Sequence, residues 1–321
     1  MSLGAAEIRF YGVRGSIPTP LRPAAVRDKI AELLSLARPA DLRGNKAIAR
    51  FLKSHYPHGS GTVGGNSSCV EMRFPGAPVI VCDAGTGLRE FGQTLIKDGQ
   101  GPREILLFLS HTHWDHIMGF PFFLPAYIKG YRLRIFGCHP KLRDRFVYQQ
   151  TATHFPVTLE QMAADMQFTE LVPGQTVEPV AGLRVTPVQQ DHPGDSFAYV
   201  FEQKGVKFIY STDSSYHYFR DLPKRQNPLS GADVFIFDAM YSFLDYMDKL
   251  DWGHSSSFVG VDFAAREGIR HLVLFHHEPA YDDQALHEIL EKTQRYAKKL
   301  YPESRMKVSL AVEGASVKAR K

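Results

Sequence analysis

The chain has 321 residues, 44% of them hydrophobic and 22% charged, which is enough for a large buried core in one or two domains. Its net charge of +4 argues against a protein that coats a polyanion, although a small positive bias suits a substrate that carries phosphate. The three cysteines, Cys69, Cys82 and Cys138, have no paired spacing, so we expect no disulfide framework and a cytoplasmic location. No apolar run reaches the roughly 20 residues of a membrane span, so we expect no membrane partner.

Apolar runs that end at polar or turn residues predict a series of strands. They span residues 7–13, 68–74, 78–85, 104–110, 132–137, 183–190, 197–203, 206–212, 233–239, 271–277 and 307–313. Several are continuous runs of Val, Ile, Leu and Phe, which is typical of strands covered on both faces. Helices are expected at 86–97, 116–128, 256–267 and 283–300. Strands mixed with helices favour an α/β layered fold, and we expect one domain over residues 1–321.

Two stretches are interpreted as insertions in this framework. Residues 21–60 are helical and mixed in charge, and residues 139–180 are irregular and then helical. Either could cap a site or decorate the surface, and surface decoration is the commoner role. Their aromatic residues could stack on a base as a lid, but we expect them to pack against their own helices. These residues are Phe51, Tyr56, Tyr148 and Phe155.

Residues 108–120, FLSHTHWDHIMGF, crowd three histidines and an aspartate together directly after an apolar run. An extended loop sends alternate side chains to the same side, so His111 and His113 can point at one centre. Asp115 and His116 follow at the start of the next helix and project towards a second centre beside the first. Imidazole and carboxylate groups are ligands of Zn²⁺, Mn²⁺ and Fe²⁺. The pattern therefore predicts a metal site, against the alternative of solvated loop histidines.

The motif SHTHWDH resembles the metal-binding signature of the metallo-β-lactamase superfamily. The resemblance covers most of the chain, from FYGVRGSIPTP to LVLFHHEP, outside the two insertions. It implies an αββα four-layer sandwich with the metal site at one edge, between two sheets. Together with the insertions, it predicts this α/β fold with two helical additions.

The resemblance also implies further ligands at the ends of later strands. His192, in QQDHPGDS, would complete the first centre. Asp213, in IYSTDSS, would bridge both centres, although a carboxylate there also suits the N-cap of a helix at 214–220. In LFHHEP we expect His276 to be the last ligand, with His277 as a neighbour that supports it.

The implied centre holds two divalent ions, with zinc favoured and manganese or iron as alternatives. Two ions about 3.5–4 Å apart lower the pKa of a water molecule between them and so supply a nucleophile at neutral pH. The resemblance assigns His111, His113 and His192 to one ion, Asp115, His116 and His276 to the other, and Asp213 to both.

The fold alone does not decide which bond is hydrolysed. The motif WGHSSS at 252–257 resembles the histidine motif of the phosphodiesterase branch of the superfamily, typified by tRNase Z. This implies that His254 contacts the scissile phosphate or protonates the leaving oxygen, so Asp115 and His254 are the expected catalytic residues. A free histidine with a pKa of about 6.5 suits that acid role. The alternative is that His254 merely precedes a capped helix.

The segments VRGSIPTP, GGNSSCVEM and DAGTGLRE resemble the glycine- and serine-rich N-terminal part of the same branch. There Asp83 could hydrogen-bond a ligand histidine. Thr86 and the amides after it could bind an anion of the substrate at a helix N-terminus. An ordinary strand–turn–helix junction explains DAGTG equally well.

The sequence departs from tRNase Z because it has no glycine- and proline-rich arm, and its basic residues are spread out. These features favour a small or cyclic phosphodiester over nucleic acid as the substrate. A thioester or lactone hydrolase like glyoxalase II is the alternative enzyme, and a metal-binding carrier is the non-catalytic alternative. A diiron oxidoreductase is disfavoured because His113 stands where those proteins usually carry a glutamate. A monomer and a homodimer are both compatible with the sequence.

Overall fold

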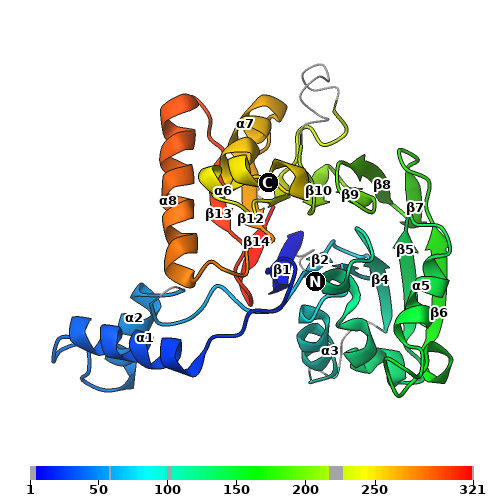
Figure 1. Cartoon of the computed structure of the whole chain (residues 1–321), viewed down its shortest axis with the longest axis horizontal. Helices are drawn as coiled ribbons and strands as arrows, with labels where there is room; N and C mark the ends of the chain where they lie inside the picture. The colour runs from blue at the N-terminus through cyan, green and yellow to red at the C-terminus, as the bar shows by residue number, and fades with distance from the viewer. Residues whose placement is uncertain (1–4, 58, 98, 100–102, 217–226, 320–321) are drawn as a thin grey trace.

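Two sheets packed face to face form the centre of the protein (Figure 1) in a computed structural model, which describes residues 5–57, 59–97, 99, 103–216 and 227–319. Within these residues each sheet has seven strands. The first runs in the order β14 (Ser316–Lys318), β1 (Glu7–Gly12), β2 (Cys69–Arg73), β3 (Val79–Cys82), β4 (Glu104–Phe108), β5 (Arg132–Gly137) and β6 (Asp165–Glu170). The second runs in the order β13 (Lys307–Leu310), β12 (His271–Phe275), β11 (Val234–Asp238), β10 (Val206–Ser211), β9 (Ser196–Gln203), β8 (Leu183–Gln190) and β7 (Val177–Val180).

Helices cover the outer face of each sheet. The first sheet carries α3 (Gly87–Lys97), α5 (Leu142–Gln149) and the 3₁₀ turns η1 (Phe120–Phe122) and η2 (Leu124–Tyr127). The second sheet carries α7 (Ser257–Glu267) and α8 (Asp283–Leu300). This arrangement confirms the αββα sandwich. The shorter elements are α4 (Trp114–Ile117), η3 (Leu159–Gln161), α6 (Phe243–Asp248) and η5 (Leu250–Trp252).

Alternation along β4 explains why its apolar run is continuous. Leu106 and Phe108 belong to the core between the two sheets, whereas Ile105 and Leu107 belong to the core under α3 and α5. Successive strand side chains point to opposite faces, so a strand that is covered on both sides needs apolar residues at every position. Phe108 also packs across the interface, with its ring centroid 5.1 Å from that of Phe201 in the second sheet.

Parallel pairing gathers polar residues at one edge of the sandwich. β3 pairs parallel with β4, and β11 pairs parallel with both β10 and β12. The carboxyl ends of each set therefore lie at one edge of their own sheet, and the contact between His111 and Asp213 brings the two edges together. The residues at or just after these ends include Asp83, His111, Asp213, Asp238 and His276.

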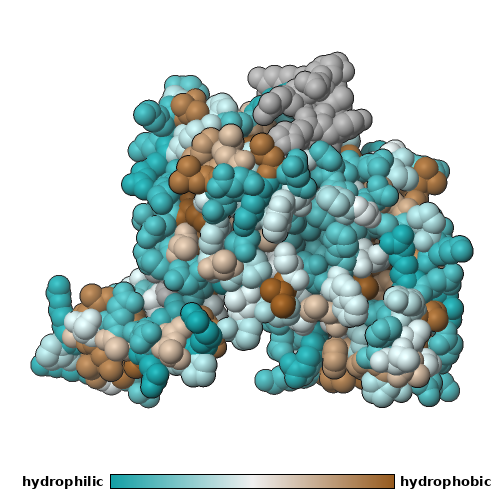
Figure 2. Space-filling model, in the orientation of Figure 1, coloured by the Kyte–Doolittle hydropathy of each residue, from teal (hydrophilic) through white to brown (hydrophobic). Residues whose placement is uncertain are grey.

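Residues 21–60 form an arm that projects from the sandwich. Its helices are α1 (Pro23–Leu36) and α2 (Asn45–Ser54), which confirms the expected helical character (Figure 1). No residue of α1 is buried. Apolar residues gather on the visible face of the arm (Figure 2), and Val26, Ile30 and Leu34 are exposed. An ion pair of 2.9 Å between Lys29 and Asp283 connects the arm to the N-terminus of α8.

Two expected elements were wrong. The helix expected at 116–128 is the short α4 followed by η1 and η2, because Pro121 and Pro125 cannot donate the backbone bonds that a continuous helix needs. Residues 139–180 were expected to be irregular and then helical, but α5 comes first and strands β6 and β7 come last. Strand β14 was also not expected. Among the described helices, none combines the length and apolar composition that a membrane crossing requires.

Candidate metal centre

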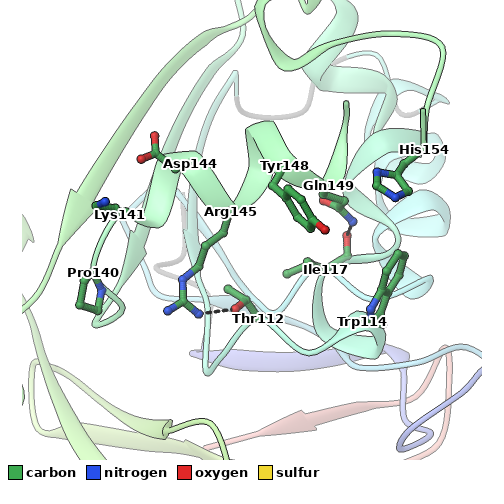
Figure 3. A pocket seen from close by; sticks show the side chains of 10 residues that line it. All are labelled: Thr112, Trp114, Ile117, Pro140, Lys141, Asp144, Arg145, Tyr148, Gln149 and His154. Atoms are coloured by element: carbon green, nitrogen blue, oxygen red, sulfur yellow. Dashed lines mark hydrogen bonds between the residues drawn. The ribbon is translucent and has the colours of Figure 1, made fainter. Parts of the chain in front are cut away.

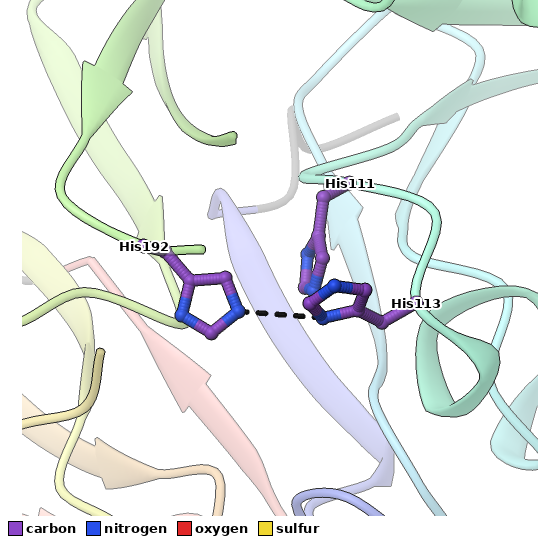
Figure 4. A group of neighbouring side chains, drawn as sticks. All are labelled: His111, His113 and His192. Atoms are coloured by element: carbon purple, nitrogen blue, oxygen red, sulfur yellow. Dashed lines mark hydrogen bonds between the residues drawn. The ribbon is translucent and has the colours of Figure 1, made fainter. Parts of the chain in front are cut away.

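Three histidines from two separate loops converge at the edge of the sandwich (Figure 4). His111 and His113 follow β4, and His192 follows β8. Nε2 of His192 lies 3.3 Å from Nδ1 of His113. Nδ1 of His192 lies 2.9 Å from the carbonyl oxygen of Gly253. A carbonyl only accepts hydrogen bonds, so Nδ1 of His192 carries the proton and its Nε2 presents a lone pair to the group.

A second group lies beside the first and is more deeply buried. It consists of Asp115, His116 and His276. Oδ2 of Asp115 lies 3.0 Å from Nε2 of His116 and 3.3 Å from Nε2 of His276. The backbone amide of Ser16, in the loop after β1, donates to the same carboxylate oxygen at 2.8 Å. The N-terminal strand therefore contributes directly to the position of Asp115.

Asp213 lies between the two groups and offers one carboxylate oxygen to each. Its Oδ1 is 3.8 Å from Nε2 of both His111 and His192. Its Oδ2 is 3.3 Å from Nε2 of His116 and 3.2 Å from Nε2 of His276. Burial would raise the pKa of Asp213, but the surrounding histidines hold that pKa well below its usual value. Asp213 is thus ionised, and both of its oxygens are available as metal ligands.

A buried carboxylate orients His116 from behind. Oδ2 of Asp83 lies 2.6 Å from Nδ1 of His116, so this nitrogen carries the proton and Nε2 faces the group. The backbone amide of Ser110 donates to the other oxygen of Asp83 at 2.7 Å. The hydroxyls of Ser110 and Tyr210 donate to Oδ2 at 2.7 and 2.6 Å. These bonds hold Asp83 in one orientation, and with it the imidazole of His116.

Several residues of the centre adopt backbone conformations that non-glycine residues rarely occupy. Asp83, Asp213 and His276 have φ values of 61°, 52° and 59°. Such left-handed conformations cost free energy and persist where the surrounding structure enforces them, often at functional sites. Gly15 has a related role, because a Cβ there would lie 2.6 Å from the ring of His276.

His254 closes the centre on the side of the second sheet. Its Nδ1 lies 2.9 Å from Oδ2 of Asp238 and 4.0 Å from Oδ1 of Asp213. Burial would lower the pKa of His254, but the carboxylate of Asp238 raises it to about 9. The expectation of a free histidine is therefore wrong, because the ring is buried and ion-paired. Its protonated form is nevertheless favoured at neutral pH.

The residues present fit divalent cations. Buried Nε2 atoms of His111 and His116 have no hydrogen-bond partner among the described residues. Burial lowers the pKa of His111 well below its usual value. Burial also opposes the charge of His116, yet Asp115, Asp213 and Asp83 raise its pKa well above the usual value. Buried imidazole nitrogens crowded together with carboxylates attract a cation, and nitrogen with oxygen ligands suits zinc, manganese or iron.

Two sequence-based expectations for neighbouring residues need correction. His277 turns away from the centre, and its Nε2 lies 2.9 Å from the carbonyl oxygen of Ala311. Burial lowers the pKa of His277 to about 3. Thr86 was expected to bind an anion, but its hydroxyl accepts from the amide of Ser67 and its amide donates to the Ser67 hydroxyl, both at 2.9 Å. Thr86 therefore locks the turn before α3, and its backbone amide is not free to bind an anion.

The helix expected at 214–220 extends into residues 217–226, which lie outside the described part of the chain. Sequence reasoning missed Asp238, which orients His254, and Ser16, whose amide holds Asp115. A signal for Asp238 was present in FIFDA, a carboxylate at the end of a fully apolar strand. Ser16 acts through its backbone, and no residue-type pattern marks such a contact.

Comparison with known proteins agrees with this geometry. The family described as "Beta-lactamase superfamily domain" matches residues 79–277, which is more than half of the chain. A ribonuclease Z of Sulfurisphaera tokodaii is 29% identical over 103 residues, which are 32% of this chain and 32% of that protein. The chain therefore matches only about a third of the length of that relative.

Solved structures resemble the protein over nearly its whole length. The metallo-β-lactamase fold protein YhfI from Bacillus subtilis superposes with a TM-score of 0.61 and 17% identity, covering 97% of this chain and 98% of that one. A diphosphatase from the PhnP family superposes with a TM-score of 0.60 and 17% identity, covering 98% of each chain. At such low identity these likenesses establish the fold.

Proposed function

Since the chain belongs to the metallo-β-lactamase superfamily, we propose that it is a metal-dependent phosphodiesterase that uses two divalent ions to hydrolyse a small or cyclic phosphodiester. One observation carries the proposal: the two oxygens of Asp213 face two separate groups of imidazole nitrogens. A carboxylate in that position can bind two ions at once, which is the arrangement of hydrolytic sites with a pair of metals.

The side chains divide between the two ions according to these distances. His111 and His192, through Nε2, and His113, through Nδ1, would hold the first ion. The second ion would be held by the neighbouring group, which consists of Asp115, His116 and His276. When bound, the ions, of which zinc is favoured, would supply an acidified water molecule and polarise a phosphoryl oxygen.

His254 is placed to act as the general acid. Asp238 keeps the imidazole protonated and fixes its ring, which lies 5.2 Å from the ring of His192 and 5.2 Å from that of His276. The proton on the nitrogen away from Asp238 can pass to the oxygen that leaves phosphorus. The leaving group of a thioester is a stable thiolate, which needs a general acid less than an alkoxide does. The position of His254 therefore favours a phosphate ester over a thioester as the substrate.

The names of the relatives support the same reaction class. A ribonuclease cleaves phosphodiesters and a diphosphatase cleaves a phosphoanhydride, so both break a bond between phosphorus and oxygen. The spread of basic residues in this chain favours a small substrate over nucleic acid.

The proposal is tested by comparing the rate at which the purified protein hydrolyses bis(p-nitrophenyl) phosphate with its rates on a panel of thioesters and lactones. Elemental analysis of the same protein measures its metal content. We expect two equivalents of metal per chain and turnover of the phosphodiester. Asp115→Ala should abolish turnover, whereas Asp28→Ala on the exposed arm should not. Turnover of thioesters alone would support the glyoxalase II-like alternative, and bound metal without any hydrolysis would support the carrier.

A further inference from the structure

A cavity of about 500 Å³ (Figure 3) is lined in part by Thr112 and Trp114, which belong to the segment that carries His111, His113 and Asp115. Its floor includes Thr112, Trp114 and Ile117, and α5 provides the opposite wall through Arg145 and Tyr148. Ligand sites for small molecules occupy about 300–1,000 Å³, so the cavity has the right size for one. The helix that forms its wall comes from residues 139–180, which the sequence marked as an addition to the framework.

The cavity and the candidate centre share one segment of chain. Thr112 stands between His111 and His113, and Trp114 stands between His113 and Asp115. Alternate residues of this segment therefore serve the two sites: one set faces the ions and the other lines the cavity. A ligand in the cavity would lie directly beside a phosphate held at the centre.

Two hydrogen bonds fix α5 to this segment. Nη1 of Arg145 donates to Oγ1 of Thr112 at 2.6 Å, and Nε2 of Gln149 donates to the carbonyl oxygen of Ile117 at 2.8 Å. Gln149 is buried and α5 packs on the sheet through Phe146. The wall is thus held in place relative to the histidine loop, as a binding site requires.

Aromatic rings border the cavity and are open to solvent. Trp114 is 65% exposed and Tyr148 is 70% exposed, although both are large apolar side chains. The sequence led us to expect Tyr148 to pack against its own small helices, but the side chain is largely exposed and its ring contacts that of His154, with the centroids 5.7 Å apart. Aromatic faces in a cavity favour a planar ligand, because each nucleobase that stacks on an aromatic ring stabilises the complex by about 1–3 kcal/mol.

Two positively charged side chains line the cavity. Lys141 and Arg145 line the cavity together with one carboxylate, that of Asp144. Arg145 uses one of its five N–H donors for Thr112. The remaining donors can contact an anion, and guanidinium groups match the geometry of phosphate oxygens.

We propose that this cavity binds the base of a nucleotide, so that the substrate class is a nucleoside phosphodiester whose phosphate lies at the candidate centre. This rests on the proposed phosphodiesterase function. Trp114 and Tyr148 provide the stacking surface, and Arg145 binds a phosphate oxygen next to the ions. An inorganic or purely aliphatic phosphodiester would use the centre and leave the aromatic rings uncovered.

Fluorescence of Trp114 provides a direct binding measurement that is independent of turnover. The chain has two tryptophans, so Trp252→Phe leaves Trp114 as the reporter. The purified full-length variant is titrated with adenosine monophosphate, adenosine and ribose 5-phosphate. We expect adenosine monophosphate to quench Trp114 and to bind at least about tenfold more tightly than ribose 5-phosphate, which has the same phosphate but no base.

Two further changes separate the contributions. Tyr148→Ala should weaken binding of adenosine about tenfold, whereas Tyr56→Ala, an exposed tyrosine on the arm, should leave it unchanged. Arg145→Gln keeps a hydrogen-bond donor for Thr112. It should weaken the binding of adenosine monophosphate but not the binding of adenosine. Equal affinities for adenosine monophosphate and ribose 5-phosphate, or unchanged binding in Tyr148→Ala, would overturn the inference.

Failure of the nucleotide-binding inference can be distinguished from failure of the proposed phosphodiesterase function. Turnover of bis(p-nitrophenyl) phosphate without any preference for the base would refute the cavity inference and leave the phosphodiesterase standing. Base-dependent quenching without turnover of any phosphodiester would refute the phosphodiesterase and show a nucleotide-binding protein.

Discussion

Nδ1 of His254 lies 2.9 Å from Oδ2 of Asp238, and this pair joins the last polar residue of β11 to the loop before α7. The same Asp238 oxygen accepts the backbone amide of Ser214 at 3.1 Å, next to Asp213. Asp238 therefore links His254 to Asp213, which lies between the two groups of the centre. The carboxylate fixes the ring and also sets its protonation.

Replacing Asp238 with Asn should move the alkaline limit of activity to lower pH. Burial favours neutral His254, and the charge of Asp238 outweighs burial to give a pKa of about 9. Asn keeps an oxygen for Ser214 but removes the charge, so the pKa of His254 falls. If His254 donates a proton to the leaving group, the alkaline limb of the kcat/KM profile moves to lower pH by the same amount.

The measurement is kcat/KM for bis(p-nitrophenyl) phosphate between pH 6 and 10, in roughly half-unit steps, with a shift of at least about one unit expected. Asp233→Asn serves as the control, because Asp233 precedes the opposite end of the same strand. An alkaline limb that stays in place in Asp238→Asn would remove His254 from the proton-transfer role.

Replacing Asp83 with Asn should weaken binding of metal without unfolding the protein. The 2.6 Å contact with His116 orients the imidazole, and loss of such a supporting carboxylate typically lowers metal affinity about 10–100-fold. Competition with a chromophoric chelator measures this affinity. Tyr210→Phe removes one bond to Asp83 and leaves its charge, so its effect should be smaller. Equal affinity in Asp83→Asn and the unchanged protein would contradict the role of Asp83.

The local part of the centre was predictable because its residues lie together in the chain. His111, His113, Asp115 and His116 fall on one loop and one helical turn, where side-chain direction follows from backbone geometry. Distant residues such as Asp213 required a resemblance to a family, because no local rule pairs one strand end with another.

Other features depend on tertiary context that the sequence does not encode locally. The sequence did not show the partner of His254, because the contact between the loop before α7 and Asp238 at the end of β11 is set by tertiary structure. Strand β6 was missed because it is an edge strand in which only Met166 and Phe168 are apolar and no residue is fully buried. By contrast, Pro121 and Pro125 were visible, and a stricter use of their helix-breaking property would have prevented the error at 116–128.

Replacing Gly253 with Ala should disturb the first group of histidines. The carbonyl of Gly253 accepts from His192, and an added Cβ would lie 2.6 Å from Nδ1 of that ring. The φ of +74° adds a backbone cost of about 1 kcal/mol for any residue with a side chain. We expect loss of about one of the two bound metal ions together with loss of turnover.

Gly182→Ala is the matched control for this change. Gly182 has a nearly identical φ of +79°, but a Cβ there meets nothing within 4 Å. Both variants should lose similar stability from the backbone, so the difference in metal content isolates the contact with His192. Full metal content in Gly253→Ala would show that the loop around residue 253 can shift to accommodate the added Cβ without displacing the ring of His192.

Replacing Glu313 with Gln should change how stability depends on pH. Burial raises the pKa of Glu313 to about 7, although the amide groups of Asn66 donate to both of its oxygens. Between pH 4.5, the ordinary value, and about 7, the folded protein keeps a proton that the unfolded chain has lost. The free energy of unfolding therefore falls as pH rises through this range, by at most about 3 kcal/mol.

Glutamine cannot ionise, so this contribution disappears in Glu313→Gln, and the variant should gain stability relative to the unchanged protein between pH 5 and 8. Urea unfolding at several pH values measures the difference, and Glu303→Gln on the exposed surface controls for the loss of one charge. Metal binding also responds to pH, but it acts equally on both proteins because Glu313 lies outside the centre. A constant difference across this range would mean that Glu313 is ionised at no cost, and that its bonds to Asn66 offset burial in full.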